Sequence, residues 1–94
     1  MIYSKADRYI INPEKIKGFV DYLYIFTQKA RMLETNLSFE YGLESKDKII
    51  IQQRWSTKQN YDEFANNPEF KKELETLNQM SKRVDKLYDL EFER

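Results

Sequence analysis

The sequence contains no cysteine and no histidine, and it has only two glycines and two prolines among its 94 residues. The absence of cysteine excludes a disulfide framework and thiol chemistry. The absence of histidine removes the commonest general base and the commonest metal ligand. We therefore expect no heme and no tightly bound transition metal.

The sequence also lacks an excess of either charge and lacks long apolar runs. Lysine and arginine together number 16, as do aspartate and glutamate, so the formal net charge is zero. A neutral chain has no field that would draw it to nucleic acid or to an anionic membrane. No apolar stretch approaches the ~20 residues that span a bilayer, and the N-terminus lacks the pattern of a signal peptide. We predict one cytoplasmic domain over residues 1–94, with no nucleic-acid and no membrane partner.

A β-hairpin between residues 37 and 55 is the clearest pattern in the sequence. Apolar and polar residues alternate over 37–43, which is typical of a strand with one buried face. The run 48–55, KIIIQQRW, is β-branched and ends on an aromatic residue, which predicts the second strand. A turn at 45–47 pairs Glu44 with Lys48. One face then carries Gln53 and seven apolar side chains that helices must cover: Leu37, Phe39, Tyr41, Leu43, Ile49, Ile51 and Trp55.

The segment before the hairpin predicts a strand and a long helix. Residues 2–11 are rich in isoleucine and tyrosine, but the pattern leaves open which face of this strand is buried. Asn12-Pro13-Glu14 is a helix start signal, and the helix extends to about Leu33. Its main apolar stripe is predicted to face the sheet. A second stripe is either an exposed surface or a partner contact: Tyr22, Ile25 and Met32.

The segment after the hairpin predicts two short helices and a last strand. Ser56, with Gln59 three residues on, forms a capping box that starts the first helix. Asn67-Pro68-Glu69 is a start signal for the second helix. The last strand covers residues 84–92, and alternation places five of its side chains on one face: Val84, Lys86, Tyr88, Leu90 and Phe92.

The order of these elements is β-α-β-β-α-β, in which the second α consists of two helical segments. It predicts an α+β, ferredoxin-like fold, with a four-stranded antiparallel sheet and both helical segments on one face. An RNA-recognition domain has the same order of elements. However, the run KIIIQQRW lacks the glycine–aromatic signature of that domain, and the chain has no basic patch.

Several short motifs follow one another in a recognisable order. They are Glu34-Thr35-Asn36-Leu37, the aromatic pair Phe39 and Tyr41, Gln53-Arg54-Trp55, Phe64, and Pro68-Glu69-Phe70. This series resembles the antibiotic biosynthesis monooxygenase (ABM) family, whose members form dimeric α+β barrels. The resemblance covers nearly the whole chain. It implies a homodimer whose two sheets face each other, with Glu40, Gln52 and Arg54 able to pair across the interface. The alternative is a sheet face that is left to water.

The sequence departs from the family pattern at three positions. Gln53 stands where the family has a glutamate, Asn36 where it has a glycine, and Phe64 where it has a histidine. Asparagine tolerates the left-handed backbone that glycine adopts, so we expect that conformation at Asn36. The other two changes remove an acid and a base. A heme-degrading branch of the family ligates iron through a histidine at the place of Leu74, so that mode of heme binding is excluded here.

The resemblance implies a cofactor-independent monooxygenase that acts on a small aromatic or quinol-like substrate, without metal or flavin. In that chemistry a base or a hydrogen bond helps to form a phenolate, a polar group stabilises the reduced oxygen, and an apolar pocket excludes water. The alternative is a non-catalytic module of the same dimeric α+β barrel fold that binds a small apolar ligand.

Gln53 and Asp7 are the candidate catalytic residues. Gln53 is the lone polar residue of an apolar face, so it either binds a ligand or has its amide bonded within the protein. Asp7 is the acid well inside the first strand, and it is either a base whose pKa burial raises or an ordinary solvated or ion-paired side chain. The candidate substrate-binding residues, which otherwise form plain core, are expected to share one cavity or one core with Gln53: Phe39, Tyr41, Trp55 and Phe64.

Overall fold

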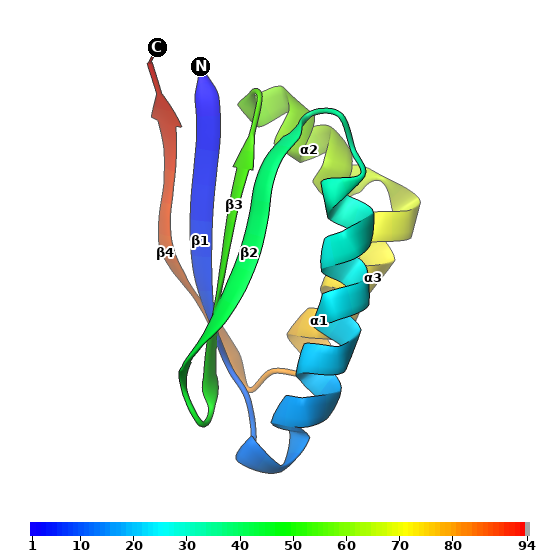
Figure 1. Cartoon of the computed structure of the whole chain (residues 1–94), viewed down its shortest axis with the longest axis vertical. Coiled ribbons are helices and arrows are strands. Elements are labelled where there is room, and N and C mark those ends of the chain that lie inside the picture. The colour runs from blue at the N-terminus through cyan, green and yellow to red at the C-terminus, as the bar shows by residue number, and fades with distance from the viewer. Residues whose placement is uncertain (94) are drawn as a thin grey trace.

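Four antiparallel strands form one sheet in the order β2-β3-β1-β4, and three helices lie on one side of it (Figure 1). The computed structural model describes residues 1–93. Its elements confirm the predicted α+β, ferredoxin-like fold and its order of elements. They are β1 (Ile2–Ile10), a short 3-10 helix η1 (Pro13–Lys15), α1 (Ile16–Arg31), β2 (Asn36–Ser45), β3 (Lys48–Trp55), α2 (Lys58–Asn66), α3 (Pro68–Gln79) and β4 (Arg83–Phe92).

Two asparagine–proline pairs start helical segments, as predicted. The side chain of Asn12 accepts a hydrogen bond of 3.1 Å from the backbone N–H of Glu14, at the start of η1. The side chain of Asn67 accepts one of 3.0 Å from the N–H of Glu69, at the start of α3. In both segments a proline occupies the first turn, where a missing N–H costs nothing.

The predicted cap of α2 is wrong by one residue. Thr57, rather than Ser56, caps the helix, because its hydroxyl accepts a hydrogen bond of 3.1 Å from the N–H of Asn60. The N–H of Ser56 instead donates to the carbonyl oxygen of Thr35 at 2.9 Å. Ser56 is therefore still hydrogen-bonded at the end of the sheet, and the helix is capped one residue later than predicted.

The register of the hairpin is as predicted in its middle and different at both ends. Tyr41 lies opposite Ile51 and Phe39 lies opposite Gln53. At the open end, β2 has a register shift between Asn36 and Ser38, so the predicted pairing of Leu37 with Trp55 is wrong. At the turn, a second register shift leaves Glu44 unpaired, and Ser45 lies opposite Lys48 in place of Glu44.

Asn36 does not have the left-handed backbone that we expected. No residue with a side chain among residues 1–93 has a positive φ. Asn36 is the first residue of β2. Its side-chain Nδ2 donates to the backbone carbonyl oxygens of Ser38 at 3.2 Å and Arg54 at 3.3 Å. The side chain therefore stabilises the irregular start of the strand through hydrogen bonds.

The structure settles which face of β1 is covered. Tyr3, Asp7 and Tyr9 are buried on the side of the helices, whereas Ser4 and Ala6 lie on the opposite face. Both faces of β1 contain buried residues, which explains why the sequence pattern was ambiguous.

The prediction that β4 presents one continuous face is wrong. A register shift separates Lys86, which lies opposite Asp7, from Tyr88, which lies opposite Ala6. Leu87 is the extra residue, and a bulge of this kind moves the following side chains to the other face. Val84 and Lys86 therefore lie on the helix side, and three residues lie on the open face: Tyr88, Leu90 and Phe92.

An aromatic cluster joins the helices to the sheet. The ring of Phe26 on α1 lies 5.7 Å from Phe39, 5.9 Å from Phe64 and 6.0 Å from Phe70, measured between ring centroids. Edge-on and tilted aromatic pairs at these distances are favourable beyond the apolar area that they bury. The main stripe of α1 faces the sheet as predicted, while Ile25 of the second stripe is 60% exposed.

We predict that Phe26→Ala lowers the free energy of unfolding by about 3–5 kcal/mol, because it leaves a cavity where three aromatic rings meet. Urea denaturation followed by circular dichroism measures this change. Ile25→Ala is the matched control on the preceding, exposed residue, and it should change stability by no more than about 0.5 kcal/mol. A loss below about 1 kcal/mol for Phe26→Ala would show that the cluster is loosely packed.

Candidate functional site

Three of the candidate substrate-binding residues form one aromatic layer between the sheet and the helices. The ring of Phe64 on α2 lies 4.5 Å from Trp55 and 6.4 Å from Phe39, and all three side chains are buried. Tyr41 is half-buried on the same face of the sheet. The expectation that these residues share one core with Gln53 is therefore confirmed.

Gln53 is buried, and its amide is bonded within the protein. The indole Nε1–H of Trp55 donates to the Gln53 Oε1 over 2.9 Å. A buried indole N–H needs an acceptor, and Gln53 supplies it from two residues away on the same face of β3. This bond uses the carbonyl oxygen of the amide, so the Nε2 protons are the part of Gln53 that can donate to a ligand.

Asp7 forms an ion pair with a lysine that the sequence analysis did not select. The Lys5 Nζ lies 3.0 Å from the Asp7 Oδ2, and the two side chains are 16% and 9% exposed. The same ammonium donates to the Tyr61 hydroxyl oxygen on α2 at 3.4 Å and lies 5.2 Å from the centre of that ring. The candidate base is therefore one part of a group of three polar side chains.

Strand pairing aligns this group with Gln53. Gln53 of β3, Lys5 of β1 and Asp89 of β4 lie side by side in one row across the sheet. Asp7 lies two residues further along β1, on the same face as Lys5. We name Lys5, Asp7, Gln53 and Tyr61 the polar group of the site.

Lys5 could have been predicted from the sequence only if the buried face of β1 were known, and no local pattern points to Tyr61. Residues two apart on a strand share a face, so a buried Asp7 implies a buried Lys5. Tyr61 belongs to the short helix α2, and its partner is 56 residues away along the chain. Contacts of that separation leave no local pattern.

Burial and nearby charges change the pKa values of Lys5 and of two neighbouring tyrosines, Tyr3 and Tyr9. Burial lowers the pKa of Lys5, but the interactions with Tyr61 and Asp7 outweigh it, and the net pKa is above the usual value. Burial raises the pKa of Tyr3 to about 12, and the charge of Asp89 adds to the effect. Burial also raises the pKa of Tyr9, with Asp7 as the second cause. The lysine is therefore held as a cation, and these two phenols are held neutral.

The largest hollow described lies on the other face of the sheet. It has a volume of about 360 Å³ and lies over the outer half of the hairpin. Gly42 contributes to it, since a Cβ added at that position would meet nothing within 4 Å. The lining residues are Glu40, Tyr41, Gly42, Leu43, Glu44, Ile50 and Gln52.

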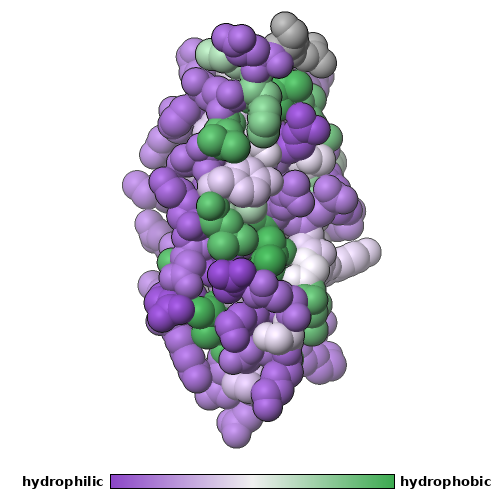
Figure 2. Space-filling view, turned by 90° about the vertical axis from the view of Figure 1, so that its left-hand side faces the viewer, coloured by the Kyte–Doolittle hydropathy of each residue, from purple (hydrophilic) through white to green (hydrophobic). Residues whose placement is uncertain are grey.

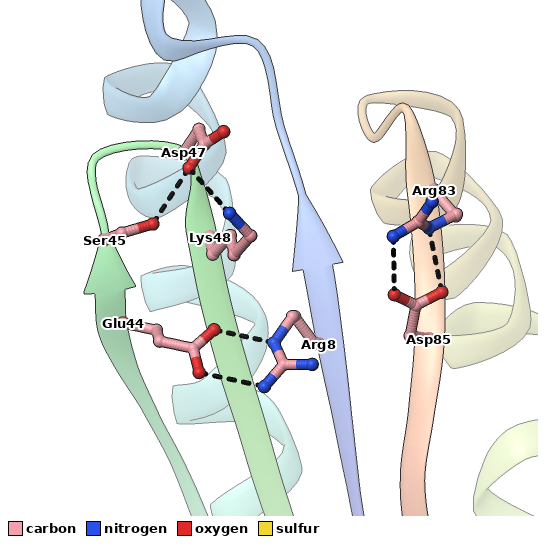
Figure 3. Close-up of polar contacts among 7 residues, drawn as sticks. All are labelled: Arg8, Glu44, Ser45, Asp47, Lys48, Arg83 and Asp85. Atoms are coloured by element: carbon pink, nitrogen blue, oxygen red, sulfur yellow. Dashed lines mark hydrogen bonds and ion pairs between the residues drawn. The ribbon is translucent and has the colours of Figure 1, made fainter.

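An ion pair crosses β3 beside this hollow. Arg8 of β1 donates from Nε to the Glu44 Oε1 at 2.6 Å and from Nη2 to Oε2 at 2.9 Å (Figure 3). The pair spans the position of Ile50, which lies opposite Arg8 in the sheet. This bidentate geometry fixes the planar guanidinium against the edge strand β2.

A second polar bridge crosses β1 on the same face. The Gln52 Nε2 donates to the Tyr88 hydroxyl over 3.1 Å, and both residues lie opposite Ala6. The small side chain of Ala6 is buried beneath this bridge. Gln52 is therefore bonded within its own chain.

The described part of the chain contains no cluster that would hold a metal. Within residues 1–93, no group of three or more carboxylate, histidine or cysteine side chains lies close enough together to bind an ion. None of the helices between Pro13 and Gln79 is long and apolar enough to cross a membrane.

Comparison with known proteins places the chain by its fold. No family model matches the sequence, and no curated protein matches it. A solved antibiotic biosynthesis monooxygenase is similar with a TM-score of 0.83 and 14% identity, over 100% of both chains. Rv0793 from Mycobacterium tuberculosis is similar with a TM-score of 0.80 and 14% identity, over 98% of both chains. SnoaB from Streptomyces nogalater, a cofactor-independent oxygenase solved as a mutant, is similar with a TM-score of 0.83 and 9% identity, over 99% of this chain and 94% of its own.

This likeness confirms the resemblance to the ABM family at the level of the fold. The similar structures cover nearly the whole chain, so the sheet and all three helices correspond. At identities of 9–14%, the likeness does not extend to individual site residues.

We predict that the free energy of unfolding falls as the pH rises above about 10. Tyr3 has a pKa of about 12 in the folded chain, so the unfolded chain, whose tyrosines ionise near 10, releases this proton first. The raised pKa of Lys5 acts in the same direction, because its stabilisation is lost as the pH rises through the folded value. Urea denaturation at a series of pH values measures the slope.

Tyr3→Phe should make that slope shallower, because one of the linked protons is removed. Tyr24→Phe, which changes an exposed phenol, is the matched control and should leave the slope unchanged. If the free energy of unfolding stays constant as the pH rises through and above about 10, the proposed effect of burial on the pKa of Tyr3 is wrong.

Proposed function

We propose that the protein is a cofactor-independent monooxygenase, acting as a homodimer on a small aromatic or quinol-like substrate. The observation that carries this proposal is the position of Asp7 and Gln53. Both lie on the helix side of the sheet, in neighbouring strands, beside the aromatic layer that contains Trp55. The ABM-like fold supports the reaction class, and SnoaB of the same fold is a cofactor-independent oxygenase.

The polar group can divide the chemistry among its members. Asp7 accepts the proton of a phenol, and the phenolate passes an electron to dioxygen. The Gln53 Nε2 protons donate to the reduced oxygen, and the aromatic layer excludes water. For a phenol that becomes a quinone, one oxygen atom enters the product and the other leaves as water. The substrate supplies all four electrons and two hydrogens, so no further reductant is needed.

The substrate enters from the side of β4 in this proposal. α2 packs over β1 and β3, whereas three residues of β4 on the same face are exposed: Lys86, Asp89 and Glu91. The buried Trp55 and Phe64 leave no room for a second ring beneath them. An aromatic substrate is therefore expected to lie at the rim, against Tyr61 and the polar group, with Phe39 and Tyr41 supporting the layer behind it.

A non-catalytic binding module of the same fold is the second candidate function. The observation that favours it is the bond between Trp55 and Gln53, which occupies the acceptor of the amide. With the acceptor occupied, Gln53 positions the indole, and a bound aromatic molecule would be held without turnover.

We predict that the wild-type protein consumes oxygen with members of a hydroquinone panel, followed with an oxygen electrode. Asp7→Asn should lower kcat/KM by about 10²–10⁴, because it removes the proton acceptor while keeping a similar shape. Asp21→Asn, an exposed change on α1, is the control. Binding of a panel member by calorimetry without oxygen uptake would favour the binding module over the enzyme.

The homodimer rests on the composition of the open face. Viewed from the side opposite the helices, apolar residues gather along the middle of the molecule (Figure 2). Leu90 and Phe92 are 50% and 44% exposed on that face. A second copy related by two-fold symmetry would cover this stripe. Glu40 and Arg54, both exposed on the same face, are then the charges that can pair between copies.

We predict that Glu40→Arg and Arg54→Glu each weaken the dimer by at least about tenfold, because each places like charges opposite one another. The double variant should restore association, since the pair is exchanged. Sedimentation equilibrium at micromolar concentration measures all four proteins. A mass near 11.5 kDa at every concentration for the wild type would mean that the face is solvated.

A further inference from the structure

The ammonium of Lys5 has a hydrogen-bond donor that its neighbours do not use. We propose that Lys5, together with the Tyr61 hydroxyl, binds the ionised oxygen of an aromatic ligand, so that the protein selects an aryl oxyanion over the neutral phenol. The proposal takes the location of the site from the proposed function. It does not need turnover, because selection of an ion is a property of binding.

The count of donors supports this assignment. A lysine ammonium has three N–H groups. The ammonium forms an ion pair with the Asp7 Oδ2 at 3.0 Å, and it donates one N–H to the Tyr61 hydroxyl oxygen at 3.4 Å. Even if the ion pair takes one N–H, one of the three remains for a ligand. Because the Tyr61 oxygen accepts from Lys5, its own proton is a second donor for the same ligand oxygen.

Burial makes these donors selective for charge. The Lys5 side chain is 16% exposed, and hydrogen bonds to a charged acceptor are stronger in such a site than in water. The interactions with Tyr61 and Asp7 keep the lysine ionised. A neutral phenol in the same place would gain only an ordinary hydrogen bond, so the ion is preferred.

Two acids near the site have cations of their own, and a third, Glu91 of β4, lies opposite Tyr3 and is exposed. Asp89, which lies opposite Lys5, is 3.3 Å from Lys86. Asp62 on α2 is 3.1 Å from Lys58. The remaining titratable neighbours, Tyr3 and Tyr9, are held neutral by burial. An incoming anion therefore meets no unpaired carboxylate at Asp89 or Asp62.

A purely structural role for the ion pair makes a different prediction. Replacing a buried ion pair by uncharged side chains of similar size is often neutral for stability. If Lys5 and Asp7 only fill space, the uncharged pair should bind ligands of either ionisation state as the wild type does.

The test uses para-nitrophenol, whose phenolate has a visible absorption band that its neutral form lacks. In the presence of the wild-type protein, the bound probe should ionise about one pH unit lower than the free probe, which is a tenfold preference for the ion. Lys5→Met/Asp7→Asn removes both charges without leaving one of them buried alone, and it should abolish the shift. Lys5→Arg should keep a shift, and Lys17→Met, an exposed lysine on α1, should keep all of it.

The proposal is overturned if the wild type does not bind the probe, if the bound probe ionises at the same pH as the free one, or if the uncharged pair retains the shift. Circular dichroism of each variant establishes that it is folded. Oxygen uptake is measured in parallel. A shift without oxygen uptake would support the anion site and contradict the monooxygenase, so the two proposals fail separately.

Discussion

The hydrogen bond from Trp55 to Gln53 connects the apolar layer of this protein to its polar group. A buried indole N–H without an acceptor would cost about 1–3 kcal/mol, so the amide belongs inside the apolar face. The ring of Trp55 in turn packs on Phe64, which brings α2 down onto the sheet. Gln53 lies opposite Lys5, and a lysine at that depth needs Asp7 beside it. The buried indole nitrogen thus requires Gln53, and the polar group forms around Gln53 and the neighbouring Lys5.

The polar group contains an acid, Asp7, in a chain that lacks the glutamate and the histidine of the ABM pattern. Phe64, which the sequence resemblance aligns with the family's histidine, is a packing residue at the centre of the aromatic layer. Two charged side chains of β1, Lys5 and Asp7, lie at the edge of that layer. Three of the four side chains of the polar group therefore come from the sheet, and the fourth, Tyr61, comes from α2; strands and helices hold side chains more rigidly than a loop would.

The sequence predicted features that local patterns encode and missed those that depend on distant contacts. The alternation in the hairpin predicted that Tyr41 and Gln53 share a face, and asparagine–proline pairs located the starts of η1 and α3. The covered face of β1 was not predictable, because small residues such as Ala6 are buried on the open face beneath a bridge from other strands. Lys5 was missed for the same reason. Bulges were missed because one extra residue leaves no mark on an alternating pattern.

The register shifts all involve the two strands at the edges of the sheet. The shifts in the hairpin ladder, near Leu37 and Glu44, separate β2 from a regular β3, and Leu87 interrupts β4. β2 and β4 are the two edge strands, while the pairing of the central strands β1 and β3 has no shift. An edge strand exposes unpaired N–H and C=O groups, and a long regular one invites other chains to add to it. Irregular edges offer no continuous ladder, so the sheet resists open-ended growth into fibrils even though apolar residues gather along the middle of its open face.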